Sequence, residues 1–140
     1  MIVDDYAHHP TEIQATLEAA RKGWDRRIIA VFQPHTYSRT REFYKEFAQS
    51  FDEADVLIIS DVYAAREKPI DGISGELIAL QAQSYGHRNV HYIPDFDKIV
   101  EFLLSEFHDG DMLITIGAGN VYKIGQMIME KLENQDMNIV

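Results

Sequence analysis

The sequence predicts an α/β domain in which helices cover both faces of a mostly parallel β-sheet of five or six strands. Five short apolar segments alternate with five segments of helical periodicity along the 140 residues. The apolar segments are rich in Ile, Val and Leu with little polar alternation, which is typical of parallel strands buried on both faces. Parallel strands are joined by right-handed crossovers in nearly all known cases. We therefore expect a Rossmann-like domain of three layers.

The strands are expected at the five apolar segments, which are residues 2–5, 28–33, 56–60, 90–93 and 112–116. The first helix is expected at residues 10–23, because proline suits the first helical position and basic residues precede the glycine at the end. Its buried stripe should consist of Ile13, Leu17, Ala20 and Trp24.

Four more helices are expected after the later strands, each with apolar residues three or four positions apart. They should begin near Ser38, after the N-cap Ser74, at Asp95 and after Gly119. Their apolar residues are Phe43, Phe47 and Phe51; Leu77, Ile78 and Ala82; Ile99, Phe102, Leu103 and Phe107; and Ile124, Met127, Ile128 and Leu132.

The composition indicates one acidic domain over residues 1–140. The chain has 13 Lys and Arg against 23 Asp and Glu, and it has no cysteine, which excludes disulfides, thiolate metal sites and cysteine nucleophiles. A net charge of −10 argues against a protein that coats nucleic acid or an anionic membrane. No apolar segment reaches the ~18 residues of a membrane span, and the N-terminus lacks a signal-peptide pattern. We therefore expect a cytoplasmic domain without nucleic-acid or membrane partners.

The first candidate site follows the first strand, where ligands of parallel sheets bind. The segment 4–10 reads DDYAHHP and leads directly into a helix N-terminus, which favours an anion. Asp5 could accept two hydrogen bonds from a ribose; alternatively, Asp4 or Asp5 only caps the turn. A metal site at His8 and His9 is disfavoured, because adjacent histidines diverge and no third ligand stands at a recognisable spacing.

The second candidate site follows the second strand. Residues 21–41 contain six basic residues and one acidic residue, but four of the basic ones precede the strand and are assigned to solubility and the helix dipole. Only Arg39 and Arg41 fall on the ligand side, where an arginine near a helix N-terminus indicates an anionic ligand.

Two further turns follow the third and fifth strands. The turn at residues 61–72 is about twice the usual length of two to six residues, which indicates a site or an interdomain contact, or else a flexible surface loop. The segment 117–120 reads GAGN and either lets the backbone approach a ligand or only starts a helix. The chain lacks a G-x-x-x-x-G-K-S/T loop, so it could supply only part of an ATP site.

Four segments in register resemble the third, C-terminal domain of the Mur ligases, and the resemblance covers essentially the whole chain. They are DDYAHHPTEI at residues 4–13, FQPH with YSRTR at 32–41, DVYAARE at 61–67 and GAGN at 117–120. The family implies a Rossmann-like domain that works with a UDP-sugar domain and a central P-loop ATPase domain, both absent from this chain. The chain would then begin inside a longer protein.

Within the family the chain is most similar to the members that join L-alanine to UDP-N-acetylmuramate in peptidoglycan biosynthesis, with ATP as a substrate. The resemblance implies that this domain has no certain catalytic residue and no metal ligand, since magnesium is bound mainly by the central domain. It implies nucleotide binding by Asp5, with Asp4 as second choice, and by His8. It implies contacts to the amino acid or other substrate groups by His35, Tyr37, Arg39, Arg41, Tyr63, Arg66, Gly117, Gly119 and Asn120.

Two alternatives remain open from the sequence. One is the related Mur ligase that attaches a recycled peptide to the same sugar nucleotide, although the context of Tyr6, Thr11 and Glu12 favours the alanine-adding members. The other is a free-standing nucleotide-binding module without catalysis. Some relatives carry Arg where this chain has Thr36, so no role is assigned to that side chain.

Overall fold

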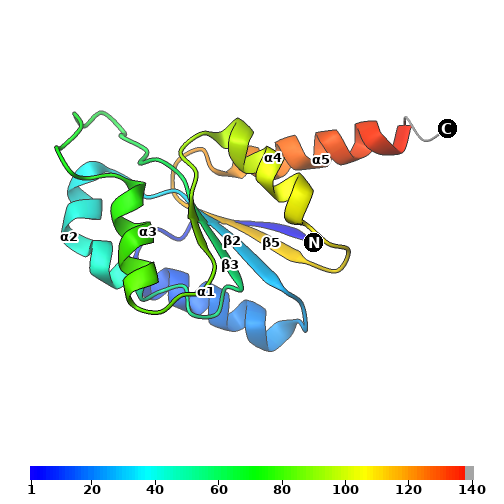
Figure 1. Cartoon of the computed structure of the whole chain (residues 1–140), viewed down its shortest axis with the longest axis horizontal. Helices are drawn as coiled ribbons and strands as arrows, with labels where there is room; N and C mark the ends of the chain where they lie inside the picture. The colour runs from blue at the N-terminus through cyan, green and yellow to red at the C-terminus, as the bar shows by residue number, and fades with distance from the viewer. Residues whose placement is uncertain (138–140) are drawn as a thin grey trace.

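The computed structural model describes residues 1–137 and contains the predicted five strands, all parallel, in the order β1-β5-β2-β3-β4 (Figure 1). The strands are β1 Ile2–Asp5, β2 Ile28–Phe32, β3 Val56–Ile59, β4 Val90–Tyr92 and β5 Met112–Ile116. The helices are α1 Pro10–Gly23, α2 Tyr37–Ala48, α3 Gly75–Ser84, α4 Phe96–Glu106 and α5 Tyr122–Met137. The predicted fold class is confirmed, and the predicted strand ends differ from the observed ones by at most one residue.

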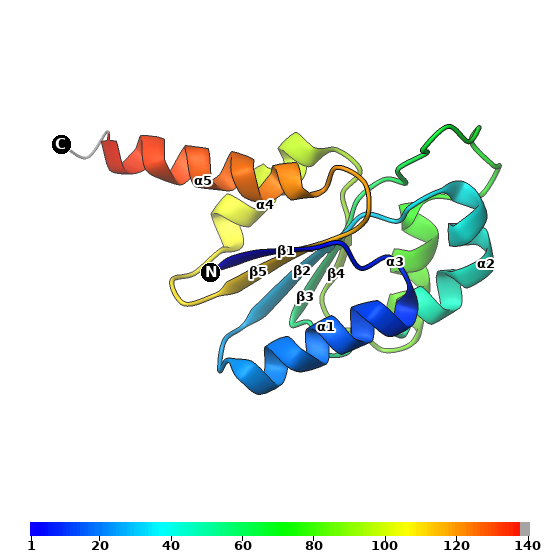
Figure 2. The same ribbon diagram turned by 180° about the vertical axis from the view of Figure 1, so that it is seen from behind.

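Two apolar cores enclose the sheet, because successive residues of a buried strand face opposite sides. On one side α1, α2 and α3 pack against Ile28, Ala30 and Phe32 of β2. On the other side α4 and α5 pack against Ile29 and Val31 of the same strand. Figure 2 shows β1 as the edge strand nearest the viewer, with the two helical layers on either side of the sheet.

Two predicted core positions are wrong. Trp24 is 46% exposed, because it follows the last residue of α1 in extended backbone and so leaves the helical stripe. Leu132 is 38% exposed, because the C-terminal part of α5 runs beyond the sheet, as Figure 1 shows. The predicted N-cap Ser74 is confirmed, and Asp95, predicted as the start of the fourth helix, is the N-cap of α4; each side chain accepts a hydrogen bond from the N–H group two residues later.

Arginine side chains join the chain segments at the edge of the sheet where the strands begin. Arg21 donates to the Asp55 carboxylate at 2.8 Å, and Arg27 donates to the Asp111 carboxylate at 2.8 Å. Arg26 donates to the carbonyl oxygen of Gly110 at 3.0 Å. Arg21 does lie in the last turn of α1, as the helix-dipole assignment requires, but all three arginines also bind segments that lie next to them only in the folded chain, a role that the sequence analysis missed.

Asp111 is 5% exposed, and this burial raises the pKa of its carboxyl. Hydrogen bonds from Arg27 and from the His108 N–H more than offset burial, so the pKa lies below its ordinary value. The ion pair is therefore formed at neutral pH. None of the helices at residues 1–137 is both long and apolar enough to span a membrane.

Candidate functional site

The strand order places a switch point at the edge of the sheet where the strands end. β5 lies between β1 and β2, yet α5 packs on the opposite face from α1 and α2. Ligands of open α/β sheets bind where neighbouring strands send their chains to opposite faces. The turns that follow β1, β2, β3 and β5 all lie at this edge, and they carry the site residues predicted from the sequence.

Asp5 ends β1 and is oriented by the start of α1. Its Oδ1 accepts a hydrogen bond from the Ala7 N–H at 2.8 Å, and its Oδ2 accepts one from the Thr16 hydroxyl at 2.8 Å. Asp5 thus stabilises the turn, whether or not it also binds a ligand. The half-buried carboxylate still has lone pairs on both oxygens, so it can accept further bonds from a ligand.

Asp4 faces the other side of β1. Its carboxylate accepts a hydrogen bond from the Thr115 hydroxyl at 2.7 Å, and it lines a groove with residues of α5. Asp5 instead lines a groove with residues of α1, including Thr16. The two adjacent carboxylates therefore do not converge on one ligand.

The prediction that His8 and His9 lack a third metal ligand nearby is wrong. His8, His9 and Glu12 each offer a ligand atom, and these atoms lie within 4.8 Å of one another. The cause is a capping box, in which Oε1 of Glu12 accepts hydrogen bonds from the N–H groups of His8 and His9 at 3.3 and 3.1 Å. This capping accounts for the cluster without a metal, and we assign none to it.

Thr36, to which the sequence analysis assigned no role, is the N-cap of α2. Its hydroxyl accepts a hydrogen bond from the Arg39 N–H at 3.3 Å, and its backbone has a φ of 67°. Its N–H donates to the carbonyl oxygen of Tyr63 at 2.8 Å. Thr36 therefore caps the helix and pairs the turn after β2 with the turn after β3.

His35 lies among residues of three of these turns. Its ring stacks on Tyr63 with centroids 5.5 Å apart, and it lies 6.4 Å from the ring of His8. Nη1 of Arg39 lies 3.5 Å from His35 Nδ1. Burial and then the positive charge of Arg39 lower the pKa of His35 below its ordinary value of 6.5. The lowered pKa favours the neutral ring, beside the Arg39 guanidinium.

The turn after β3 carries Tyr63 and Arg66, and it is not a freely flexible loop. The Tyr63 N–H donates to the carbonyl oxygen of Pro34 at 2.8 Å, which ties it to the turn after β2. Further along, the Glu67 carboxylate accepts hydrogen bonds from the N–H and the hydroxyl of Ser38. Arg66 itself is exposed.

The glycines after β5 make room for protein groups. A Cβ atom at Gly119 would lie 2.6 Å from both Oε1 of Gln33 and the ring of Tyr63. A Cβ atom at Gly117, which has a φ of 154°, would lie 3.0 Å from the carbonyl oxygen of Gln33. The described contacts thus favour the tight turn over close approach of a ligand at these two positions.

Gln33 and Asn120 join the turns after β2 and β5. Nε2 of Gln33 donates to Oδ1 of Asn120 at 2.7 Å, and the Asn120 N–H donates to Oε1 of Gln33 at 3.1 Å. Gln33 is 4% exposed. Sequence reasoning included Asn120 but missed Gln33, although a glutamine directly after a buried strand is a signal that could have indicated it.

The structure brings most of the predicted residues together. The ring of His35 lies next to that of His8 and stacks on that of Tyr63. Tyr63 in turn lies against Gly119, so residues of all four turns meet. Tyr37 is half-buried at the start of α2, and the more distant Arg41 is exposed on the same helix.

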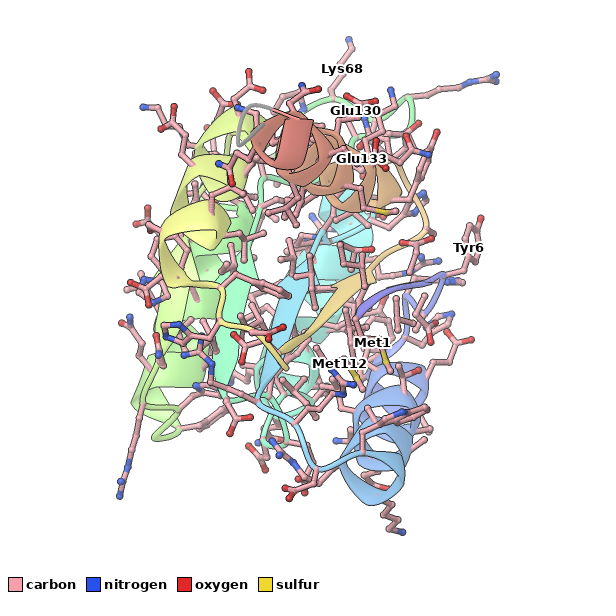
Figure 3. The ribbon with its side chains drawn as sticks, turned by 90° about the vertical axis from the view of Figure 1, so that its right-hand side faces the viewer. Met1, Tyr6, Lys68, Met112, Glu130 and Glu133 are labelled. Atoms are coloured by element: carbon pink, nitrogen blue, oxygen red, sulfur yellow. The ribbon has the colours of Figure 1, made fainter. Side chains whose placement is uncertain are left out.

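Three functional candidates were missed: Gln33, Glu67 and Tyr6. Tyr6 is 69% exposed and lies edge-on to His8, with ring centroids 5.6 Å apart. Figure 3 shows it pointing away from the sheet at the end of β1. An exposed aromatic ring next to Asp5 was a signal in the sequence that could have been used.

The chain resembles known proteins over nearly its whole length. Residues 1–119 match the family described as Mur ligase, glutamate ligase domain. The UDP-N-acetylmuramate–L-alanine ligase of Geotalea uraniireducens is 50% identical over 133 residues, which cover 95% of this chain and 29% of that ligase. This chain therefore spans less than a third of the length of that relative.

Two solved structures have the same fold. The UDP-N-acetylmuramate-alanine ligase of Thermotoga maritima superposes with a TM-score of 0.78 at 21% identity, covering 96% of this chain and 27% of that one. A murein peptide ligase of Psychrobacter arcticus superposes with a TM-score of 0.75 at 25% identity, covering 95% and 27%. With the family match over residues 1–119, these findings show that the chain belongs to the Mur ligase family.

Proposed function

We propose that the chain is the C-terminal domain of an ATP-dependent ligase that joins L-alanine to UDP-N-acetylmuramate in cytoplasmic peptidoglycan biosynthesis. The observation that carries this proposal is the 50% identity to a ligase of that name over 95% of the chain. The rest of the enzyme, a UDP-sugar domain and a central ATPase domain, would supply the triphosphate site that this sequence lacks.

The reaction forms an amide bond in two steps. ATP phosphorylates the carboxylate of UDP-N-acetylmuramate, and the amine of L-alanine then attacks the acyl phosphate and releases phosphate. Water would hydrolyse the acyl phosphate, so closure of this domain over the other two protects the intermediate. The domain contributes by binding and positioning, because the nucleophile and the phosphoryl group belong to the substrates.

The residues at the edge of the sheet divide into two groups in this proposal. Asp5 accepts hydrogen bonds from the ribose of ATP, and His8 lines the nucleotide side. We prefer Asp5 to Asp4, because the Asp4 carboxylate is bonded to Thr115 on the other face of β1. Arg39 and Arg41 bind the anionic groups of the reaction.

The remaining predicted residues shape the substrate side. His35 and Tyr37 lie at the start of the segment that faces the amino acid, and the ring of Tyr63 stacks on the ring of His35. The lowered pKa of His35 favours its neutral ring, so that Arg39 supplies the positive charge at this point, which suits the carboxylate of an amino acid. Arg66 and the turn at residues 117–120 border this region.

Magnesium fits this domain poorly, since the ion prefers several converging oxygen ligands. Asp4 and Asp5 face opposite sides of the sheet, so their carboxylate oxygens do not converge on one ion. We therefore assign the ion to the central domain and derive no step through it.

The proposal is tested with the full-length ligase that contains this domain. We expect Asp5→Asn to raise the apparent KM for ATP about tenfold, since each hydrogen bond to a charged group contributes about 1.5–3 kcal/mol. Asp4→Asn is the matched control and should leave the constant unchanged. An unchanged constant in Asp5→Asn would show that Asp5 only stabilises its turn.

Substrate choice separates this proposal from its alternatives. The murein peptide ligase fold at 25% identity makes a peptide substrate the second candidate. The full-length enzyme should release phosphate with L-alanine and not with a murein peptide; the reverse result would assign it to the peptide-attaching reaction. The 140-residue chain alone should release none, and alanine-dependent release by it would refute the proposal.

A further inference from the structure

Two anchors hold the loop between β3 and α3 against the turn that follows β2. The first is a pair of backbone hydrogen bonds, from Tyr63 N–H to Pro34 O and from Thr36 N–H to Tyr63 O, both at 2.8 Å. The second is the side chain of Glu67, which accepts hydrogen bonds from the Ser38 N–H at 3.0 Å and from the Ser38 hydroxyl. Within this loop, backbone hydrogen bonds hold Tyr63, and the Glu67 carboxylate holds the chain four residues further on.

A tight turn lies between the two anchors and carries Arg66. The Glu67 N–H donates to the carbonyl oxygen of Ala64 at 3.0 Å, which closes the turn. Ala65 and Arg66 have φ values of 59° and 123°, a region that residues with a Cβ atom rarely adopt. Such a conformation persists only where its surroundings impose it, and the bonds of Glu67 to Ala64 and to Ser38 are the contacts on its C-terminal side.

The same carboxylate acts on α2. Ser38 immediately precedes Arg39, whose guanidinium lies 3.5 Å from His35. The bond from Ser38 to Glu67 therefore joins the chain neighbour of Arg39 to the chain neighbour of Arg66. Loss of that bond would leave the backbone pairing at Tyr63 intact and would release only the part of the loop that carries Arg66.

We propose that Glu67 is a positioning residue that holds Arg66 beside the Arg39 segment through Ser38. For catalysis the inference rests on the proposed ligase function, in which this segment faces the amino acid. A simpler alternative is that Glu67 only stabilises the N-terminus of α2, where a negative charge is favourable. The two differ in what they predict for the loop and for the kinetic constants.

The kinetic experiment uses the full-length ligase with Glu67→Ala and Glu67→Gln. We expect Glu67→Ala to raise the KM for L-alanine about tenfold, because misplacing a binding group weakens an interaction without removing it. The KM for ATP should not change. Glu67→Gln keeps an acceptor for the Ser38 N–H and should recover part of the loss, and it serves as the test if Glu67→Ala does not fold.

Glu76 offers a matched control, because it is the acidic residue in the first turn of the neighbouring helix α3 and is exposed. Glu76→Ala should leave both KM values unchanged. Equal effects of Glu67→Ala and Glu76→Ala, or a lower melting temperature in Glu67→Ala with unchanged KM values, would overturn the proposal in favour of simple helix stabilisation.

Amide hydrogen exchange on the 140-residue chain separates this inference from the ligase proposal. In Glu67→Ala the amides of Ser38 and Glu67 should lose protection while that of Tyr63 keeps it. That result together with a wild-type enzyme that does not use L-alanine would refute the ligase function and leave the anchoring role standing. Unchanged protection at Ser38 and Glu67 would refute the anchoring role itself.

Discussion

Replacing Gln33 with alanine tests whether the joint between the turns after β2 and β5 stabilises the domain. The substitution removes two hydrogen bonds, from Gln33 Nε2 to Asn120 Oδ1 at 2.7 Å and from Asn120 N–H to Gln33 Oε1 at 3.1 Å. Gln33 is 4% exposed, so water cannot readily take its place. A hydrogen bond contributes about 0.5–1.5 kcal/mol net, and a buried group left without a partner costs about 1–3 kcal/mol.

We therefore expect Gln33→Ala to lower the free energy of unfolding by about 2–4 kcal/mol, the Asn120 groups being only partly buried. For a chain of this size, about 3 °C of Tm accompanies each kcal/mol, so thermal unfolding should shift down by about 6–12 °C. Gln14→Ala on the exposed face of α1 is the control and should stay within about 0.5 kcal/mol.

A double-mutant cycle with Asn120→Ala isolates the joint itself. Because both single variants break the same two bonds, we expect the double variant to be less destabilised than the sum of the singles, with a coupling of about 1–3 kcal/mol. Strict additivity would show that the two side chains act independently and would refute the reasoning. Urea unfolding at constant m-value provides the free energies.

Three further predictions concern packing and protonation. Gly119→Ala should destabilise the domain by about 1–3 kcal/mol through overpacking, whereas Gly23→Ala, with no atom within 4 Å of the new Cβ, should be neutral or stabilising in thermal unfolding. The folded-state pKa of Asp111 lies below its ordinary value of 3.8. The Asp111 carboxylate therefore contributes its full stabilisation above pH 3.8, and this contribution is lost as the pH falls through the folded-state pKa. In Asp111→Asn, the free energy of unfolding measured between pH 7 and 2 should depend less steeply on pH in that window. An NMR titration of His35 should give a pKa below 6.5, and a higher value would contradict the effect of burial.

Local sequence patterns were sufficient to predict the strands and helices and the edge of the sheet that carries the site. Ser74 and Asp95 start helices because a side-chain oxygen close in sequence satisfies a free N–H group, and this needs no information about the rest of the fold. The prediction that all site turns share one edge follows from parallel strands alone. Errors arose where an element ended, as at Trp24, because burial beyond the last turn depends on neighbours that periodicity does not describe.

Contacts within the site could be predicted only in part. Asp5 and Arg39 were identified by residue type and place, and His35 by the family resemblance. The residues that contact them in the folded chain were not predicted. Gln33 was missed because an amide side chain indicates no function until its partner is known. The role of Thr36 as a helix cap also required its backbone conformation, with a φ of 67°.

By itself the sequence determined five β–α units, a parallel sheet and the edge at which ligands would bind, since hydrophobic periodicity and capping residues act over a few positions. The tertiary structure alone decided that β5 lies between β1 and β2, and this order sets which turns meet. Gln33 and Asn120 are 87 positions apart, and Ser38 and Glu67 are 29 apart. Such pairs form because the sheet packs its strands in one order among several that the same periodicity would permit.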